Sequence, residues 1–136
     1  MNKKYQILKD IFGHDKFRSF QEEVVDCILN KQDVLTILPT GGGKSLCYQL
    51  PTLLMNGTTV VISPLIALMQ DQIKALNDLN ISAEMISSAT SNDENSFTLQ
   101  KLLNGELKFI YVAPERFSSN EFVGVLQRIN INYFVI

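Results

Sequence analysis

Cysteine is scarce in this sequence, and long apolar runs are missing from it. The two cysteines, Cys27 and Cys47, form no Cys-x-x-Cys pair and have no second cysteine cluster beside them, so we expect two buried free thiols in a reducing cytosol and no cysteine-based zinc site. No apolar run reaches the length of a membrane span. We also expect no signal peptide, because Lys9 and Asp10 interrupt the apolar residues near the start. These absences favour a cytoplasmic protein without a membrane partner.

Strong net charge is also missing. The formal net charge is −2, so any binding of nucleic acid has to come from a local groove and not from bulk charge. The 136 residues, of which 46% are hydrophobic, suffice for one domain with a sizeable core.

Short apolar runs alternate with segments of helical periodicity along the chain. Five strands separated by helices predict parallel βαβ units, hence an α/β fold with a doubly wound sheet. Such sheets bind ligands beyond the carboxyl ends of their strands. The expected strands are residues 33–38, 58–62, 83–86, 108–112 and 133–136, and the expected helices are residues 5–12, 65–79, 93–105 and 119–127.

A further helix is expected to begin at Ser19, because Glu22 follows at the spacing of a capping box. The first helix is expected to end at Gly13, and Ser119 is expected to cap the last one.

The stretch "ILPTGGGKSLCYQLP", residues 37–51, contains most of a phosphate-binding loop between a predicted strand and a predicted helix. Leu38 stands where the first glycine of the usual pattern belongs, but that position still lies in the strand. We expect Lys44 to reach the β- and γ-phosphates of a nucleotide and the Ser45 hydroxyl to ligate Mg²⁺. The alternative is a Gly-rich turn with an incidental lysine. The candidate phosphate-binding residues are Thr40, Gly41, Gly42, Gly43, Lys44 and Ser45.

Four motifs in order resemble those of RecQ-family helicases of superfamily two. "LPTGGGKSLCYQLP" resembles motif I, "FGHDKFRSFQ" resembles the RecQ motif 0, "VVISPLIALMQDQ" resembles motif Ia, and "YVAPERF" resembles motif Ib. The resemblance implies a RecA-like P-loop NTPase domain, an ATP-dependent DNA helicase activity with 3′ to 5′ polarity, and the cofactors ATP and Mg²⁺. It also implies single-stranded and forked DNA as partners, work in DNA recombination and repair, and association with the nucleoid in a bacterium.

The resemblance to motif 0 assigns three residues to the adenine base. Gln21 resembles the glutamine that reads the adenine edge, and Arg18 resembles the arginine beside the base. His14 stands where the family usually has a stacking tyrosine, so a plain loop residue is an equal alternative there. For Gln21 the alternative is a polar residue on an exposed helix face.

The motifs Ia and Ib imply contacts to the DNA backbone. We expect Leu65, Leu68 and Met69 to pack in the core instead. A solvated helix face is an equal alternative for Gln72, and an ion pair with Glu115 or another acid, which would hold the loop, is a comparable alternative for Arg116. The candidate DNA-binding residues are Ser63, Pro64, Gln72 and Arg116.

The sequence stops at Ile136, where the family's DExH box begins. We therefore interpret residues 1–136 as the N-terminal part of the first RecA-like domain, with residues 1–32 as a helical lead-in that carries motif 0. The second RecA-like domain would act in cis. The resemblance also implies that strands 33–38 and 133–136 lack the strand that lies between them in the family. We expect residues 1–136 alone to be poorly stable and catalytically silent.

Two other classes stay open at this point. One is a DEAD-box-type RNA remodeller, although the Phe-Arg-x-x-Gln spacing at 17–21 favours the RecQ type. The other is a non-motor P-loop nucleotide-binding protein.

Overall fold

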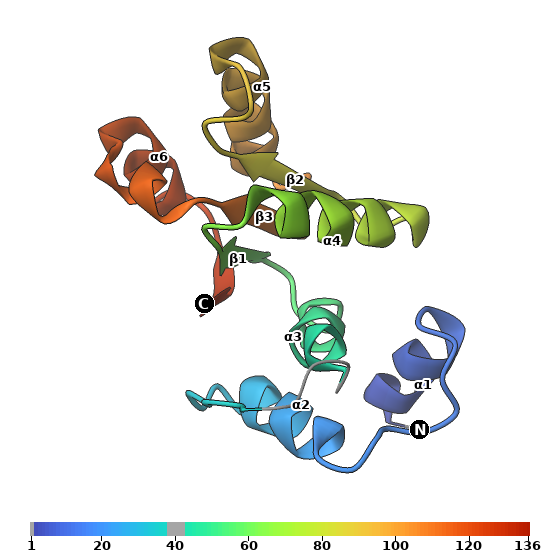
Figure 1. Cartoon of the computed structure of the whole chain (residues 1–136). Coiled ribbons are helices and arrows are strands. Elements are labelled where there is room, and N and C mark those ends of the chain that lie inside the picture. Colours follow the sequence, from blue (N-terminus) through green and yellow to red (C-terminus); the bar gives the residue numbers. More distant parts are fainter. Residues whose placement is uncertain (1, 38–42) are drawn as a thin grey trace. The chain divides into compact units, whose positions relative to one another are not determined.

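The computed structural model describes residues 2–37 and 43–136. The chain forms two compact units, Met1–Met55 and Asn56–Ile136. Figure 1 shows three helices in the first unit, and a sheet with its helices in the second.

The first unit is built from helices α1 (Lys3–Asp10), α2 (Gln21–Leu29) and α3 (Lys44–Thr52). Apolar side chains at helical spacing bring these helices together, and both α1 and α2 pack on α3. The buried residues of this core are Leu8, Val25, Leu46 and Leu50. Helix α1 was expected at 5–12 and runs slightly earlier, followed by Gly13 with φ +73°.

The predicted buried strand at 33–38 is wrong over the residues that are described. Residues 33–37 belong to no strand, and Leu35 and Ile37 are 87% and 85% exposed. A strand is stable only where neighbouring strands take up its N–H and C=O groups, and no described residue pairs with this segment. Leu38 lies outside the described residues.

The predicted capping box at Ser19 is also wrong. Helix α2 begins at Gln21, its N-cap is Phe20 with φ 112°, and no side chain caps it. The Glu22 carboxylate is instead bound by Lys4 Nζ at 2.8 Å and by the Tyr5 hydroxyl, so it is unavailable for a capping bond.

The second unit contains a parallel sheet of four strands in the order β2-β3-β1-β4, where five had been expected along the chain. The strands lie where the sequence predicts them, apart from shifts of one or two residues at their ends. The bounds are β1 (Thr58–Ile62), β2 (Ala83–Ile86), β3 (Phe109–Val112) and β4 (Ile131–Val135). The helices are α4 (Ile66–Asp78), α5 (Asn92–Leu103) and α6 (Asn120–Leu126), and a 3₁₀ turn, η1 (Pro114–Ser118), follows β3.

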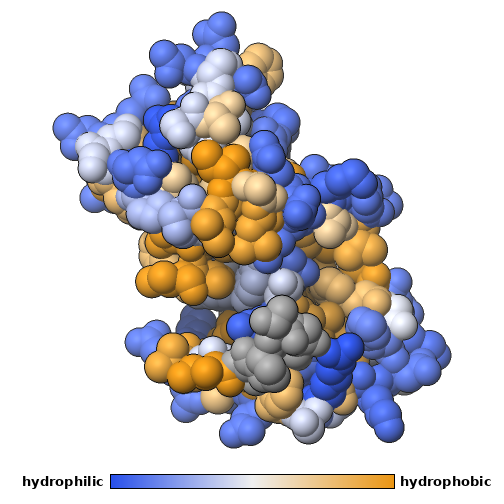
Figure 2. Space-filling model, in the orientation of Figure 1, coloured by the Kyte–Doolittle hydropathy of each residue, from blue (hydrophilic) through white to orange (hydrophobic). Residues whose placement is uncertain are grey.

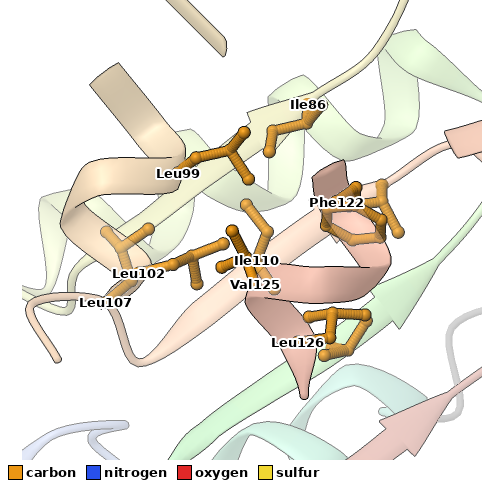
Figure 3. Close-up of a cluster of buried hydrophobic side chains, with 10 residues drawn as sticks. Ile86, Leu99, Leu102, Leu107, Ile110, Phe122, Val125 and Leu126 are labelled. Carbon is orange, nitrogen blue, oxygen red and sulfur yellow. The ribbon is translucent and has the colours of Figure 1, made fainter. Parts of the chain in front are cut away.

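The core of the second unit lies between the sheet and helices α5 and α6. Figure 3 shows Leu99 and Leu102 of α5 and Phe122, Val125 and Leu126 of α6 gathered around Ile86 of β2 and Ile110 of β3. Helix α4 packs on β2 and buries Met69 and Leu76. This arrangement confirms the α/β fold with a parallel sheet.

Several large apolar side chains remain at the surface, and Figure 2 shows hydrophobic patches among the polar ones. Met69 is buried as expected, but Leu65 and Leu68 are 59% and 46% exposed, so their predicted core packing is wrong. Leu65 is the N-cap of α4 and Leu68 stands in its first turn, so both lie at the N-terminal end of this helix. Among the residues that the structure describes, no helix is long and apolar enough to cross a membrane.

Candidate functional site

Helix α3 begins directly after the glycine triplet. Its N-cap, Gly43, has φ +78°, a left-handed conformation that favours glycine. Among the described residues no side chain caps this helix end, and its first turn contains no acidic residue. The N–H groups of the first turn and the positive end of the helix dipole therefore suit an anion. Lys44 is exposed and Ser45 half-buried at this end, while Thr40, Gly41 and Gly42 lie outside the described residues.

Gln21 joins the motif 0 segment to this helix end. Its Oε1 accepts a hydrogen bond from Arg18 N at 2.8 Å, and its Nε2 donates to Gly43 O at 3.1 Å. Gln21 is only 5% exposed, so the alternative of an exposed helix-face residue is wrong. A Cβ on Gly43 would lie 2.3 Å from Gln21 Nε2 and 3.8 Å from Arg18 Nη1. Glycine is therefore the only residue type at position 43 that permits this close approach without displacing the Gln21 amide.

A hollow of about 330 Å³ lies along the motif 0 segment of the first unit. Arg18 lines it, and the rings of Tyr5 and Phe17, which also line it, are 5.8 Å apart. His14 is exposed and is not among the lining residues. The aromatic contribution of Tyr5 was missed from the sequence, because it comes from α1 and only the tertiary fold brings it to Phe17. The lining residues are Tyr5, Asp15, Lys16, Phe17, Arg18, Ser19, Phe20 and Glu22.

Lys4 of α1 forms a charged cluster with two acidic residues of α2. Its side chain is 7% exposed and contacts Asp26 Oδ1 at 2.6 Å and Glu22 Oε2 at 2.8 Å. Burial alone would lower the pKa of Lys4, but the hydrogen bonds to Asp26 and Glu22 raise it overall. The hydrogen bonds from Lys4 and Tyr5 lower the pKa of Glu22, and the bond to Glu22 raises the pKa of Tyr5. This cluster fastens α1 to α2 and keeps Lys4 protonated.

In the second unit, the segment after β1 leads into helix α4, whose N-terminus has no side-chain cap. Ser63 N donates to Val112 O at 3.0 Å, which fixes Ser63 beside the end of β3. The Ser63 hydroxyl accepts from Leu65 N at 3.2 Å. Leu65 is the N-cap of α4, no side-chain oxygen caps this helix, and its first turn has no acidic residue. Pro64 is exposed, so this helix end is open to solvent at the carboxyl edge of the sheet.

Arg116 does not form the ion pair with Glu115 that the sequence left open. Its Nη2 donates to the carbonyl oxygen of Ser87 at 2.9 Å, which links η1 to the segment after β2. Gln72 lies half-buried in the middle of α4, away from that helix's N-terminus. The structure thus brings Ser63 and Pro64 to the end of β1 and Arg116 to the end of β3, and it leaves Gln72 further along α4.

The N-terminus of α5 differs from those of α3 and α4. Ser91 Oγ accepts from Glu94 N at 3.1 Å and Glu94 Oε1 accepts from Ser91 N at 3.2 Å, a complete capping box. Asp93 and Glu94 place negative charge in its first turn, so this end is closed to anions. The sequence carried the signal, since Ser91 and Glu94 have the spacing that was assigned to Ser19 and Glu22.

The described residues contain no group of three or more His, Cys, Asp or Glu side chains that could hold a metal ion. Both cysteines are free as expected, although only Cys47 is buried and Cys27 is half-buried. Burial raises the pKa of the Cys47 thiol, which makes it a poor nucleophile at neutral pH.

Comparison with known proteins assigns this chain to a family. The family model described as DEAD/DEAH box helicase matches residues 18–136. The chain belongs to the DEAD/DEAH box helicase family. Both the motif 0 glutamine and the open helix ends described above fall within the matched residues.

The relatives confirm the resemblance to RecQ helicases. The ATP-dependent DNA helicase RecQ of Bacillus subtilis is 45% identical over 132 residues, which are 96% of this chain and 22% of that protein. The RecQ helicase of Haemophilus influenzae is 42% identical over 96% of this chain and 21% of its own length. The ATP-dependent DNA helicase Q-like 2 of Arabidopsis thaliana is 45% identical over 88% of this chain and 17% of its own length. The chain thus spans about a fifth of the length of the curated relatives it matches.

Solved structures agree on the fold. The crystal structure of DUF1998 helicase MrfA bound to DNA and AMPPNP superimposes with a TM-score of 0.79 at 20% identity, covering 98% of this chain and 20% of that one. Identity at this level supports the RecA-like fold alone.

Proposed function

We propose that this chain supplies nucleotide-binding and DNA-binding elements of an ATP-dependent DNA helicase of the RecQ type. ATP and Mg²⁺ are its cofactors, single-stranded and forked DNA are its substrates, and a second RecA-like domain in cis completes the motor. Translocation in the 3′ to 5′ direction and a role in DNA recombination and repair belong to the proposal through the RecQ relatives. The relatives at 42–45% identity are named as DNA helicases, which favours this function over an RNA remodeller or a non-motor nucleotide-binding protein.

One observation carries the nucleotide part of the proposal. The Gln21 Nε2 bond to Gly43 O, at 3.1 Å, connects the segment that resembles the adenine-reading motif with the helix end that resembles the phosphate-binding motif. A nucleotide with its base near Arg18 and the aromatic hollow, and its phosphates near Lys44, would engage both segments together. His14 contributes least here, because it is exposed and does not line the hollow.

The helix end at Gly43 fits a polyphosphate. It combines the N–H groups of a first helical turn that has no acidic residue with an exposed lysine and a neighbouring hydroxyl. Lys44 would neutralise charge on the terminal phosphates, and Ser45 would give Mg²⁺ one oxygen ligand, the remainder coming from phosphate and water. Bound Mg²⁺ supplies electrostatic stabilisation of the transferring phosphoryl group. The side chains of this chain bind and orient the nucleotide.

The DNA part of the proposal is supported by the carboxyl edge of the sheet. Ser63 and Pro64 lead into the open N-terminus of α4, whose free N–H groups suit backbone phosphates without reading sequence. Gln72 and Arg116 complete the proposed surface, although Gln72 stands farther along α4. The exposed Leu65 and Leu68 side chains add apolar area for the sugar–base side of a single strand.

The proposal is tested with Lys44→Ala in the product of the complete gene. ATP hydrolysis stimulated by single-stranded DNA should fall by about 100-fold or more, because backbone N–H groups cannot replace the lysine charge at the transferring phosphoryl group. Affinity for single-stranded DNA, measured by fluorescence anisotropy without nucleotide, should stay within about twofold.

Lys9→Ala is the matched control, because Lys9 is an exposed lysine on α1. It should leave hydrolysis unchanged. Near wild-type turnover in Lys44→Ala would contradict the nucleotide assignment. Hydrolysis stimulated by single-stranded RNA but not by DNA would instead favour the RNA remodeller.

A further inference from the structure

The carbonyl oxygen of Ser87 accepts hydrogen bonds from two N–H groups in the second unit, and a hydroxyl lies close to it. Ser87 directly follows β2 and is completely buried. Its carbonyl accepts from Arg116 Nη2 at 2.9 Å and from Thr90 N at 3.3 Å, and Thr90 Oγ1 lies 2.8 Å from it. A carbonyl with this many partners cannot move without breaking several hydrogen bonds. Ser87 therefore fixes the start of the segment between β2 and α5.

The rest of that segment is ordered from Ser87 outward. Ser87 N donates to Thr90 Oγ1 at 3.0 Å, and Ala89 N donates to Ser87 Oγ at 3.1 Å. Thr90 Oγ1 also lies 2.6 Å from Asn95 Oδ1, which connects the turn to the buried side of α5. The turn at 87–91, called here the β2–α5 loop, is thus tied at one end to α5 and at the other to Arg116.

Arg116 reaches this loop from a different part of the chain. Its own turn, η1, is anchored by Arg116 N donating to Ala113 O at 3.1 Å, and Ala113 N donates to Ile86 O at 3.4 Å. The guanidinium thus spans the gap between the ends of two adjacent strands, β2 and β3. Because the contacted carbonyl is inaccessible to solvent, this charge-assisted bond is stronger than one on the surface.

We propose that Arg116 is a positioning residue, which acts on DNA binding through the β2–α5 loop and not through a direct contact to a DNA phosphate. The inference rests on the proposed function, because it assumes that the carboxyl edge of the sheet receives single-stranded DNA. Arg116 holds the β2–α5 loop against η1, so the ends of β2 and β3 form one preorganised rim. The exposed tip of the loop, Ser88 and Ala89, is kept in a single arrangement.

Salt dependence separates positioning from a phosphate contact. A side chain that neutralises one phosphate of a single strand contributes about 0.7 to the slope of log affinity against log salt concentration. Arg116→Gln, in the product of the complete gene, should weaken single-stranded DNA binding on the order of tenfold with an unchanged slope. Arg116→Lys keeps the charge but shortens the reach to Ser87, so it should behave like Arg116→Gln.

Hydrogen exchange tests the tether without DNA. Amides in residues 87–91 should exchange at least about tenfold faster in Arg116→Gln than in wild type. Arg128→Gln is the control, because it removes an equal charge from an exposed position that lines a different cavity, beside Gly57 and Asn130. It should change neither exchange in the loop nor DNA affinity.

Several outcomes would overturn the proposal. They are a slope reduced by about 0.7 in Arg116→Gln, full rescue by Arg116→Lys, and unchanged exchange at 87–91. A lower melting temperature with unaltered DNA affinity would also overturn it, since the role would then be purely structural. A wild-type protein that binds no single-stranded DNA would contradict the proposed function, and the exchange experiment would still decide whether Arg116 holds the loop.

Discussion

The N-termini of α3 and α5 differ in how they are capped. Every helix begins with N–H groups that have no partner inside the helix. At α5 the capping box of Ser91 and Glu94 satisfies them, and Asp93 adds favourable charge. At α3 the N-cap is Gly43, with no capping side chain and no acid in the first turn. The α5 end is stabilised by its cap, and the α3 end is the one proposed to bind a nucleotide.

Helix α4 resembles α3 in this respect, and α6 resembles α5. Leu65 offers α4 no capping oxygen, and no acid stands in its first turn. Ser119 caps α6 by accepting from Phe122 N, and Glu121 supplies the charge there. The open ends lie within the segments that resemble motifs I and Ia. A helix that forgoes a cap gives up about 1 kcal/mol, so an open end is best explained by a function for it.

The largest effect is expected from closing the open end of α3 sterically. Gly43→Ala places a Cβ 2.3 Å from Gln21 Nε2 and requires a φ of +78° that alanine disfavours by about 1–2 kcal/mol. Displacement of the amide or of the helix end should lower kcat/KM for ATP by about 100-fold, measured by DNA-stimulated hydrolysis.

The double variant Gly43→Ala with Gln21→Ala sharpens this test, because it removes the clashing amide. It should recover part of the loss if the clash is its main cause. Gly124→Ala is the control, since a Cβ there meets no atom within 4 Å. Wild-type hydrolysis in Gly43→Ala would show that the close approach of Gln21 to this helix end is irrelevant to catalysis.

A smaller effect is expected from capping the open end of α4 chemically. Leu65→Asp should stabilise α4 by about 1 kcal/mol, because aspartate is a good N-cap and leucine a poor one. The same carboxylate should repel a DNA phosphate, so affinity for single-stranded DNA should fall by about tenfold. Melting temperature and fluorescence anisotropy give the two quantities.

Leu65→Asn separates the two effects, since asparagine caps equally well without charge. Leu65→Asn should gain the same stability as Leu65→Asp with a smaller loss of affinity for single-stranded DNA. The reverse test is Ser91→Ala, which removes the cap of α5. It should lower stability by about 1 kcal/mol with no change in DNA binding. If Leu65→Asp left DNA affinity intact, the open end of α4 would not be a phosphate site.

The same local pattern had different outcomes at two places in this chain. Ser19 and Glu22 have the spacing of Ser91 and Glu94, yet only the second pair forms a capping box. The difference is tertiary, because Lys4 and Tyr5 bind Glu22 from another helix. Periodicity and spacing predicted the strands at 58–62 and 83–86 well, since those segments depend on neighbours within the same sheet.

What the sequence could not show depends on distant partners. Residues 33–37 have the composition of a buried strand, but composition does not provide a neighbouring strand. The Gln21–Gly43 bond joins residues 22 positions apart, and the Arg116–Ser87 bond joins residues 29 apart. Motif resemblance singled out Gln21, Gly43 and Arg116 as candidate site residues. Only the fold shows that Gln21 and Arg116 bind backbone carbonyls.

Helix α2 is an intermediate case, and it gives the smallest predicted effect. It has no side-chain cap, but Glu22 and Glu23 stand in its first turn and Lys4 binds Glu22 from α1. The pKa of Glu22 is held below its ordinary value of 4.5, so its stabilising contribution is present above that pH and is lost as the pH falls through the lowered value. The pKa of Lys4 is raised above 10.5, so its contribution is complete below that pH and is lost as the pH rises through the raised value.

The melting temperature of wild type should therefore exceed that of Lys4→Met by a constant amount between about pH 5 and pH 10, and the difference should shrink in both acid and base. Lys74→Met, which removes an 80%-exposed lysine paired with Asp78, should show no such plateau. A wild-type advantage over Lys4→Met that does not vary from pH 3 to pH 11 would mean that Lys4 stabilises α2 by packing its stem, and the charges at this helix end would then contribute nothing to closing it.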